Sequence, residues 1–149
     1  MDNLFSDGDR KAILDRLERL PSAARRIWGK MDAAQMLAHC SAALEVATGD
    51  APRSQMFLGR LLAPFFKGKI LGETPFSKDS PTDPGFIVTG PRDFQKEKAR
   101  LTALVDRFCD EGSAAADGRV HSFLGRLSGE EWGRMMWKHL DHHLRQFGA

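Results

Sequence analysis

The sequence is poor in cysteine, with two in 149 residues. Cys40 and Cys109 each fall inside an expected helix, and neither belongs to a Cys-x-x-Cys pair. Paired or closely spaced cysteines would indicate a disulfide framework or a zinc motif, and this chain has neither pattern. We therefore expect two reduced, buried thiols in a cytoplasmic protein.

Long apolar runs and basic tracts are also missing. The longest apolar candidate, Met56–Phe66, is interrupted by Arg60 and Pro64 and is shorter than the roughly 18 residues that a membrane helix needs. The start of the chain is polar and acidic with no apolar stretch after it, so we expect no secretory signal. Because 22 basic and 20 acidic residues are spread along the chain, we expect neither nucleic acid nor a membrane as a partner.

What remains is the composition of one soluble domain, and we expect residues 1–149 to form it. Apolar residues recur at helical spacing in four segments, and no segment predicts a convincing sheet, so the expected fold class is all-α. A linker containing Trp28, which we expect to fill part of the core, joins the first two helices. The four predicted helices cover Asp9–Leu20, Asp32–Thr48, Pro91–Asp110 and Ser128–Ala149.

Two of these helices have clear start signals. Asp32 is followed three residues later by Gln35, and Ser128 by Glu131. In such a capping box each side chain satisfies a free backbone donor of the first turn. Gly49 is a plausible end for the second helix, because glycine readily adopts the left-handed conformation found there.

The pattern weakens between the second and third helices, from Asp50 to Gly90. Gln55–Phe66 predicts a short helix, and turn-forming residues dominate from Thr74 to Gly85. Phe86–Val88 predicts a brief extended piece. A loop of this length is uncommon in a compact domain unless it has a function. We expect a long irregular crossover packed on the helices, with a lid over a pocket as the alternative.

The last helix carries a histidine pair on its apolar side. At about 100° per residue, His139 and His143 point close to the middle of the apolar stripe. Burying two unpaired imidazoles is costly, and one bound metal ion would satisfy both. A metalloprotease would have a glutamate directly after the first histidine of this His-x-x-x-His motif, and Leu140 stands there instead. The sequence therefore excludes a metalloprotease of this type. The same side of the helix carries Trp132, Met135, Met136, Leu140 and Phe147.

A third ligand is predicted on the second helix. His39 lies on the flank of that helix's apolar face, and it is the only other histidine on a strong helix. We therefore predict a metal site formed by His39, His139 and His143. The alternative is three separate histidines, in the core or on the surface, that bond to local partners.

Several neighbours of these ligands are assigned by the same helical angles. His142 is expected to be exposed or to lie beside the ligands, and Asp141 to be solvated. His121 is expected in a loop, largely outside the site. Glu45 and Gln146 are candidates to orient a ligand, because a metal-bound imidazole usually donates its other nitrogen to an acceptor.

Three neutral imidazoles leave at least one position open on the ion, which is typical of catalytic rather than structural sites. Imidazole suits zinc, nickel, copper or iron. We expect a divalent metal ion, with zinc and nickel as the first candidates. Such an ion lowers the pKa of a bound water or thiol. The site therefore favours hydrolysis or thiol transfer without deciding between them.

Four segments carry a family resemblance: WGKM at 28–31, QMLAHC at 35–40, FLGRL at 123–127 and KHLDHHLRQFG at 138–148. Together they resemble the DinB-like superfamily, and more closely a small bacterial branch of it of unknown function. The resemblance covers almost the whole chain, although residues 50–90 match only loosely.

The resemblance implies a four-helix bundle that holds a divalent metal ion between helices, often as a homodimer. Residue by residue, the superfamily's metal ligands fall on His39, His139 and His143. Relatives with assigned activities include transferases that use a low-molecular-weight thiol, and some isomerases.

Three functions remain open from the sequence. The first is a metal-dependent enzyme, a thiol transferase or a hydrolase. The second is a non-catalytic dimeric bundle in which a metal only stiffens the fold. The third is a helical adaptor without metal, which requires His39 to lie away from His139 and His143.

Overall fold

The computed structural model describes all residues from 1 to 149, and the chain is mainly helical, as predicted. A short antiparallel hairpin, absent from the prediction, pairs Val120 with Arg126 and His121 with Gly125. The helices are α1 (Asp7–Arg19), α2 (Ala33–Ala47), α3 (Phe57–Leu71), α4 (Phe94–Glu111), α5 (Ser113–Ala116) and α6 (Gly129–Gln146). A 3-10 turn, η1, covers Pro84–Phe86, and the hairpin strands are β1 (Val120–His121) and β2 (Gly125–Arg126).

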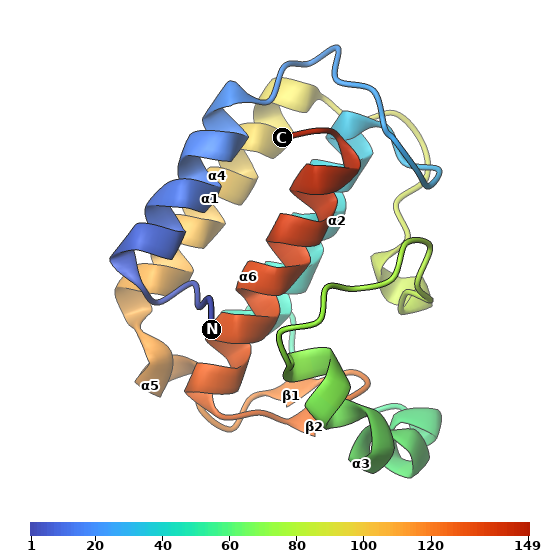
Figure 1. The fold of residues 1–149 in the computed structure, drawn as a ribbon, viewed down its shortest axis with the longest axis vertical. Coiled ribbons are helices and arrows are strands. Elements are labelled where there is room, and N and C mark those ends of the chain that lie inside the picture. Colours follow the sequence, from blue (N-terminus) through green and yellow to red (C-terminus); the bar gives the residue numbers. More distant parts are fainter.

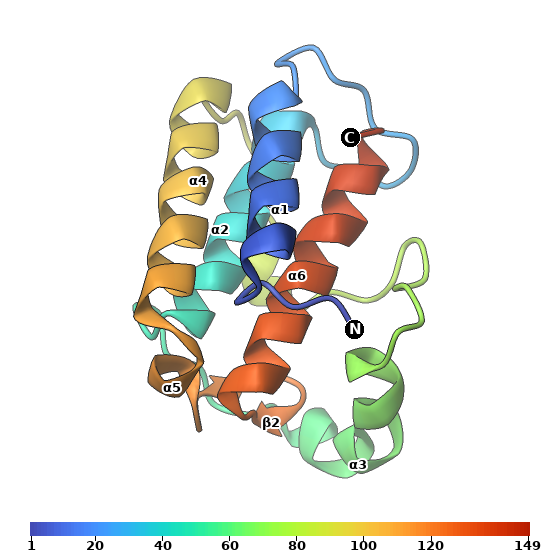
Figure 2. The same cartoon turned by 60° about the vertical axis from the view of Figure 1, so that its left-hand side comes forward.

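Helices α1, α2, α4 and α6 run side by side (Figures 1 and 2). Helices α1 and α2 each contact both α4 and α6, so the four surround a common interior. Helix α3 lies at one end of them, next to the hairpin and the start of α6. No helix is long and apolar enough to cross a membrane. The largest fully buried side chains are Trp132, Phe108, Leu4, Ile13, Leu17, Leu20, Met36, Leu37, Leu44, Leu101, Leu127 and Leu140.

Both predicted capping boxes are present, and they fix the first turns of α2 and α6. The Asp32 carboxylate accepts from the Gln35 backbone N–H at 2.8 Å, and the Gln35 side chain accepts from the Asp32 N–H at 2.9 Å. Ser128 and Glu131 make the same two bonds at 3.2 and 2.9 Å. Because the first turn sets the direction of every later side chain, these boxes orient the two helices that carry His39, His139 and His143.

Asp141 is buried, and the prediction that it is solvated was wrong. The residue is only 7% exposed. The Arg16 guanidinium of α1 lies 2.8 Å from one carboxylate oxygen, and Arg145 lies 2.9 Å from the other. Helix α1 covers this side of α6, so a residue that points away from the histidine stripe still faces another helix rather than water.

Trp28 is half-buried and does not fill the core as expected. Its ring contacts the edge of the His142 ring, with the centroids 5.6 Å apart, and the Lys78 ammonium lies 4.9 Å from its centroid. The linker therefore passes over the outside of α6 beside the last histidines, and Trp28 closes that surface instead of entering the interior.

The crossover between α2 and α4 contains more helix than predicted. Helix α3 ends at Leu71, five residues beyond the predicted Phe66, and it passes through Pro64. The Lys138 ammonium of α6 donates to the carbonyls of Lys69, Ile70 and Gly72, at 3.4, 2.6 and 2.8 Å. A cation at the carboxyl end of a helix bonds the free carbonyls and offsets the helix dipole. Of the predicted extended piece Phe86–Val88, Phe86 belongs to the turn η1, and Ile87 has an extended backbone.

The other end of α3 is fixed to the hairpin loop. The Met56 N–H donates to the Ser122 carbonyl at 2.7 Å, and the Gln55 side chain donates to the Phe123 carbonyl at 2.9 Å. Gly59 makes the close approach possible, since a Cβ there would lie 2.4 Å from the Phe123 oxygen. The crossover is therefore a packed structure held at both ends, in line with the expectation of an irregular packed crossover.

Candidate metal centre

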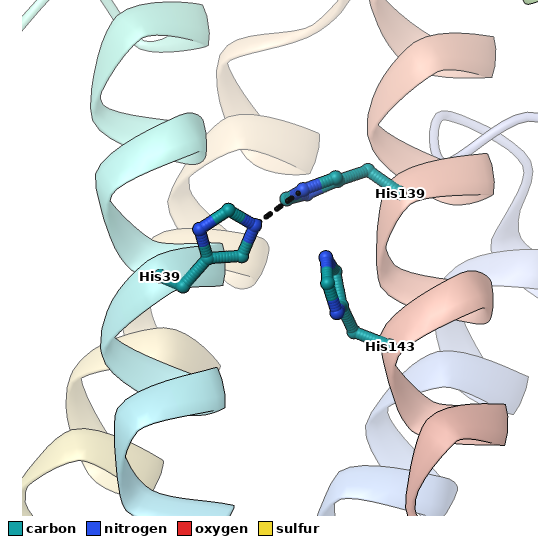
Figure 3. Close-up of side chains that lie close together, drawn as sticks. All are labelled: His39, His139 and His143. Carbon is teal, nitrogen blue, oxygen red and sulfur yellow. Dashed lines mark hydrogen bonds between the residues drawn. The ribbon is translucent and has the colours of Figure 1, made fainter. Parts of the chain in front are cut away.

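The structure brings His39, His139 and His143 together in the interior between α2 and α6 (Figure 3). One ring nitrogen of each residue lies within 4.8 Å of the corresponding nitrogens of the other two. The closest pair is Nε2 of His39 and Nε2 of His139, which are 3.0 Å apart. The adaptor hypothesis required His39 to lie elsewhere, and this geometry removes it.

Helical spacing and burial explain the cluster. His139 and His143 stand one turn apart on α6, and His39 faces them from α2 (Figure 3). His39 is 2% exposed and His143 is 9% exposed, and His139 is half-buried as a residue with its ring Nδ1 fully buried. The nitrogens of the cluster are therefore largely withdrawn from solvent.

The crossover fixes the ring of His39. Its Nδ1 lies 2.8 Å from the Phe86 carbonyl and can only donate to it, so the proton is on Nδ1 and the Nε2 lone pair faces the cluster. The turn that presents this carbonyl is closed by the Asp83 carboxylate, which accepts from the Gly85 N–H at 2.8 Å. The Arg53 guanidinium stacks on the Phe86 ring, 4.8 Å from its centroid.

Gln146 fixes the ring of His143. The amide nitrogen of Gln146 donates to the Trp28 carbonyl at 2.8 Å, so its oxygen faces His143 and accepts from Nδ1 at 2.8 Å. The proton of His143 is then on Nδ1, and Nε2 is free to bind a metal. Gly29 leaves room for this amide, since a Cβ there would lie 2.3 Å from the Gln146 nitrogen.

The orienting role expected of Gln146 is found, and that of Glu45 is not. The Glu45 carboxylate instead forms an ion pair with Arg100 of α4, at 2.5 Å. The Phe86 and Trp28 carbonyls were missed by sequence reasoning. A backbone carbonyl carries no residue-type signal, so only the path of the chain reveals it.

The third ring, His139, has a buried nitrogen that lacks a partner. Its Nδ1 makes no hydrogen bond. Its Nε2 faces the unprotonated Nε2 of His39 at 3.0 Å. In a tetrahedral site with metal–nitrogen bonds of about 2.0–2.1 Å, neighbouring ligand nitrogens are about 3.3 Å apart. The residues therefore fit a divalent ion: they provide three imidazole donors within 4.8 Å of one another, two of them with a fixed tautomer, and one pair is close to the required spacing.

Burial keeps these imidazoles neutral. Desolvation lowers the pKa of His39, against the opposing effect of its bond to the Phe86 carbonyl. Desolvation and the neighbouring histidines together lower the pKa of His139 well below its ordinary value and, against the opposing effect of the bond to Gln146, that of His143 to about 3. A neutral imidazole is the form that binds a metal ion, so all three rings are ready to bind near neutral pH.

The family model for "Protein of unknown function (DUF1569)" matches residues 3–149. The chain belongs to this family. Searches of curated proteins and of solved structures found no match. The family carries no assigned activity, so the function of this DUF1569 chain has to be argued from its site.

The two remaining histidines of the DUF1569 chain lie outside the cluster. His142 is half-buried, and its ring lies 5.0 Å from that of His143 and 5.8 Å from Phe76, centroid to centroid. His121 accepts from the Phe123 and Leu124 backbone N–H groups, both at 3.1 Å, and so holds the hairpin loop together. Burial lowers the pKa of His121 to about 4.

Two clefts lie beside the histidine end of α6 in the DUF1569 chain. One, of about 140 Å³, reaches His142, and the other, of about 260 Å³, extends toward the N-terminus. They have four lining residues in common: Pro75, Lys138, Asp141 and Arg145. Space for a small ligand therefore exists next to the ring that contacts His143.

Proposed function

We propose that the chain is a metal-dependent enzyme with the four-helix-bundle fold of the DinB-like superfamily. His39, His139 and His143 would hold a divalent metal ion, and zinc and nickel are the first candidates for it. The observation that carries the proposal is the convergence of three neutral imidazole nitrogens from two helices within 4.8 Å. The packing of α1, α2, α4 and α6 around a common interior supports the bundle.

The chain's own groups set up the site before any ion binds. The Phe86 carbonyl and the Gln146 amide hold the Nδ1 protons of His39 and His143, which leaves both Nε2 lone pairs directed at one point. The cleft that reaches His142, whose ring contacts that of His143, supplies an approach for a substrate. Three neutral ligands leave at least one position on the ion for that substrate or a water.

An ion bound there would lower the pKa of a bound thiol or water, which supports thiol transfer or hydrolysis. We propose a low-molecular-weight thiol as the first substrate class, in keeping with the resemblance to thiol-dependent transferases. No carboxylate belongs to the cluster. A general base for hydrolysis would therefore have to come from outside the three histidines, which makes thiol activation the simpler use of this site.

Elemental analysis of untagged protein tests the metal site. We expect close to one equivalent of zinc or nickel in the wild type and a near-complete loss in His39→Ala and His139→Ala. His142→Ala is the matched control, because its ring contacts His143 without joining the cluster. Less than about half an equivalent of any divalent metal after careful loading would end the proposal.

A second candidate function is a structural metal in a non-catalytic, dimeric bundle. It is favoured by the burial of His39, which is 2% exposed and bonded to the crossover, so that an ion would tie α2, α6 and the crossover together. The absorption spectrum of cobalt-loaded protein separates the two candidates. A change on adding 2-mercaptoethanol supports an open position and the enzyme. An unchanged spectrum supports the structural role.

A further inference from the structure

The exposed apolar side chains of this protein are concentrated on one helix. Six of its nine exposed large hydrophobic residues fall between positions 56 and 66, and Phe57 and Phe65 are 77% and 81% exposed. Single exposed apolar residues are normal, but a contiguous group marks an interaction surface. The six residues are Met56, Phe57, Leu58, Leu61, Phe65 and Phe66.

Three of these side chains face away from the hairpin against which α3 packs. The buried face of α3 uses small residues, Gly59 and Ala63, to lie close to the hairpin. At about 100° per residue, Phe57, Leu61 and Phe65 stand on successive turns of the opposite side. The other long helices lie on the inner side of α3 (Figures 1 and 2). Helix α3 is thus apolar on two sides, and the fold uses only one of them.

The charge that this segment of the chain carries is all of one sign. No aspartate or glutamate occurs between Ala51 and Gly72, whereas that segment carries four basic residues. Lys67 is paired with Glu131 at 2.9 Å, but Arg60 and Lys69 form no ion pair. Two copies of α3 placed face to face would bring these cations together with no carboxylate on the helix to offset them. An anionic lipid surface offsets them directly.

We propose that α3 docks on an anionic phospholipid bilayer. The helix lies in the plane of the interface, with Phe57, Leu61 and Phe65 among the upper acyl chains and Arg60 and Lys69 at the headgroups. Its ends are held by the bonds to Lys138 and to the hairpin loop, so the docking surface is formed before it meets a membrane. This revises the expectation of no membrane partner, because a net charge of +2 for the whole chain conceals one basic, apolar end.

Vesicle flotation of the full-length protein tests the proposal. We expect flotation with phosphatidylcholine vesicles that contain phosphatidylglycerol, weakening as salt is added, and none with phosphatidylcholine alone. The double variant Phe57→Ser/Phe65→Ser should lower the partition coefficient by about tenfold or more. The control Ile27→Ser/Ile87→Ser removes two apolar side chains that are 65% and 60% exposed elsewhere, and it should float like the wild type.

Circular dichroism and metal content of each variant show that it is folded and that its histidine cluster is intact. Failure of the wild type to float with anionic vesicles overturns the proposal, as does equal binding to both kinds of vesicle. Sedimentation analysis tests the alternative occupant of this face, a second copy of the chain. A wild-type dimer that Phe57→Ser/Phe65→Ser converts to a monomer would assign the face to a second copy and also overturn the proposal. None of these outcomes depends on whether the histidines bind a metal.

Discussion

Gln146 decides which nitrogen of His143 is available to a metal. In Gln146→Leu the acceptor for the Nδ1 proton is lost, and the Trp28 carbonyl loses its donor. We expect metal affinity to fall about 10- to 100-fold, as on removal of other groups that orient a metal ligand. Competition against a chromophoric chelator measures it. An affinity equal to that of the wild type would show that His143 needs no orienting group.

Gly29 gives a test with a matched control. Gly29→Ala places a Cβ 2.3 Å from the Gln146 nitrogen at a φ of +82°. Gly90→Ala has the same backbone strain at a φ of +86° but no atom within 4 Å of the added carbon. The backbone strain should cost each variant about 1 kcal/mol of unfolding free energy, and displacement of the Gln146 amide should add to the cost in Gly29→Ala. Only Gly29→Ala should also weaken metal binding, and equal metal affinities in the two variants would contradict the arrangement.

At the residue scale, the sequence predicts which side chains form the cluster better than it predicts the groups to which these side chains bond. Helical angles and one histidine on a second helix were enough to select His39, His139 and His143. The Phe86 and Trp28 carbonyls were not predicted. They belong to the backbone of the crossover and of a linker, and no residue type encodes the paths of these segments. The geometry that directs the lone pairs is therefore the part that required the structure.

At the scale of elements, the capping boxes placed the starts of α2 and α6 to within one residue, whereas the end of α3 was predicted five residues too early. Asp32 and Ser128 predict the starts of α2 and α6 from local sequence, because a cap is formed by residues within one turn. The end of α3 depends on Lys138, nearly seventy residues away in the sequence. A prediction from local pattern ends α3 near Phe66 because nothing nearby in the sequence stabilises its last turn.

Lys138→Met tests this long-range cap. Removing the ammonium leaves the carbonyls of Lys69, Ile70 and Gly72 without their donor. We expect about 2 kcal/mol less unfolding free energy and faster amide hydrogen exchange over the last turn of α3. Lys98→Met is the control. Its ammonium bonds the Glu18 and Leu20 carbonyls at the end of α1, so exchange should rise there and not in α3.

At the scale of the whole molecule, α6 is a central helix with a different role on each side. One side presents His139 and His143 to α2, and another holds Asp141 against Arg16 of α1. A helical wheel gives the angle of each side chain but not the position of the surrounding helices. Asp141 was predicted to be solvated because the wheel shows a polar side, and only the packing of α1 shows that this side is covered.

The same central position makes the stability of the metal-free protein depend on pH. Burial lowers the folded-state pKa of His39 and His139, and it lowers that of His143 from 6.5 to about 3. As the pH falls below about 6.5, the unfolded chain takes up protons that the folded chain cannot accept, so the free energy of unfolding decreases. Urea unfolding in the presence of a chelator, from about pH 7.5 down to about pH 5, measures this loss.

Metal and pH should act on the same three rings. Zinc at 100 times its dissociation constant should stabilise the protein by about 2.7 kcal/mol near pH 7.5, and this gain should shrink toward pH 5 as protons compete for the ligand nitrogens. In His39→Leu both the gain from zinc and part of the acid loss should disappear, because one ligand and one buried imidazole are removed together. A variant that lost the zinc effect but kept the full acid loss would show that His39 does not contribute to the pH dependence.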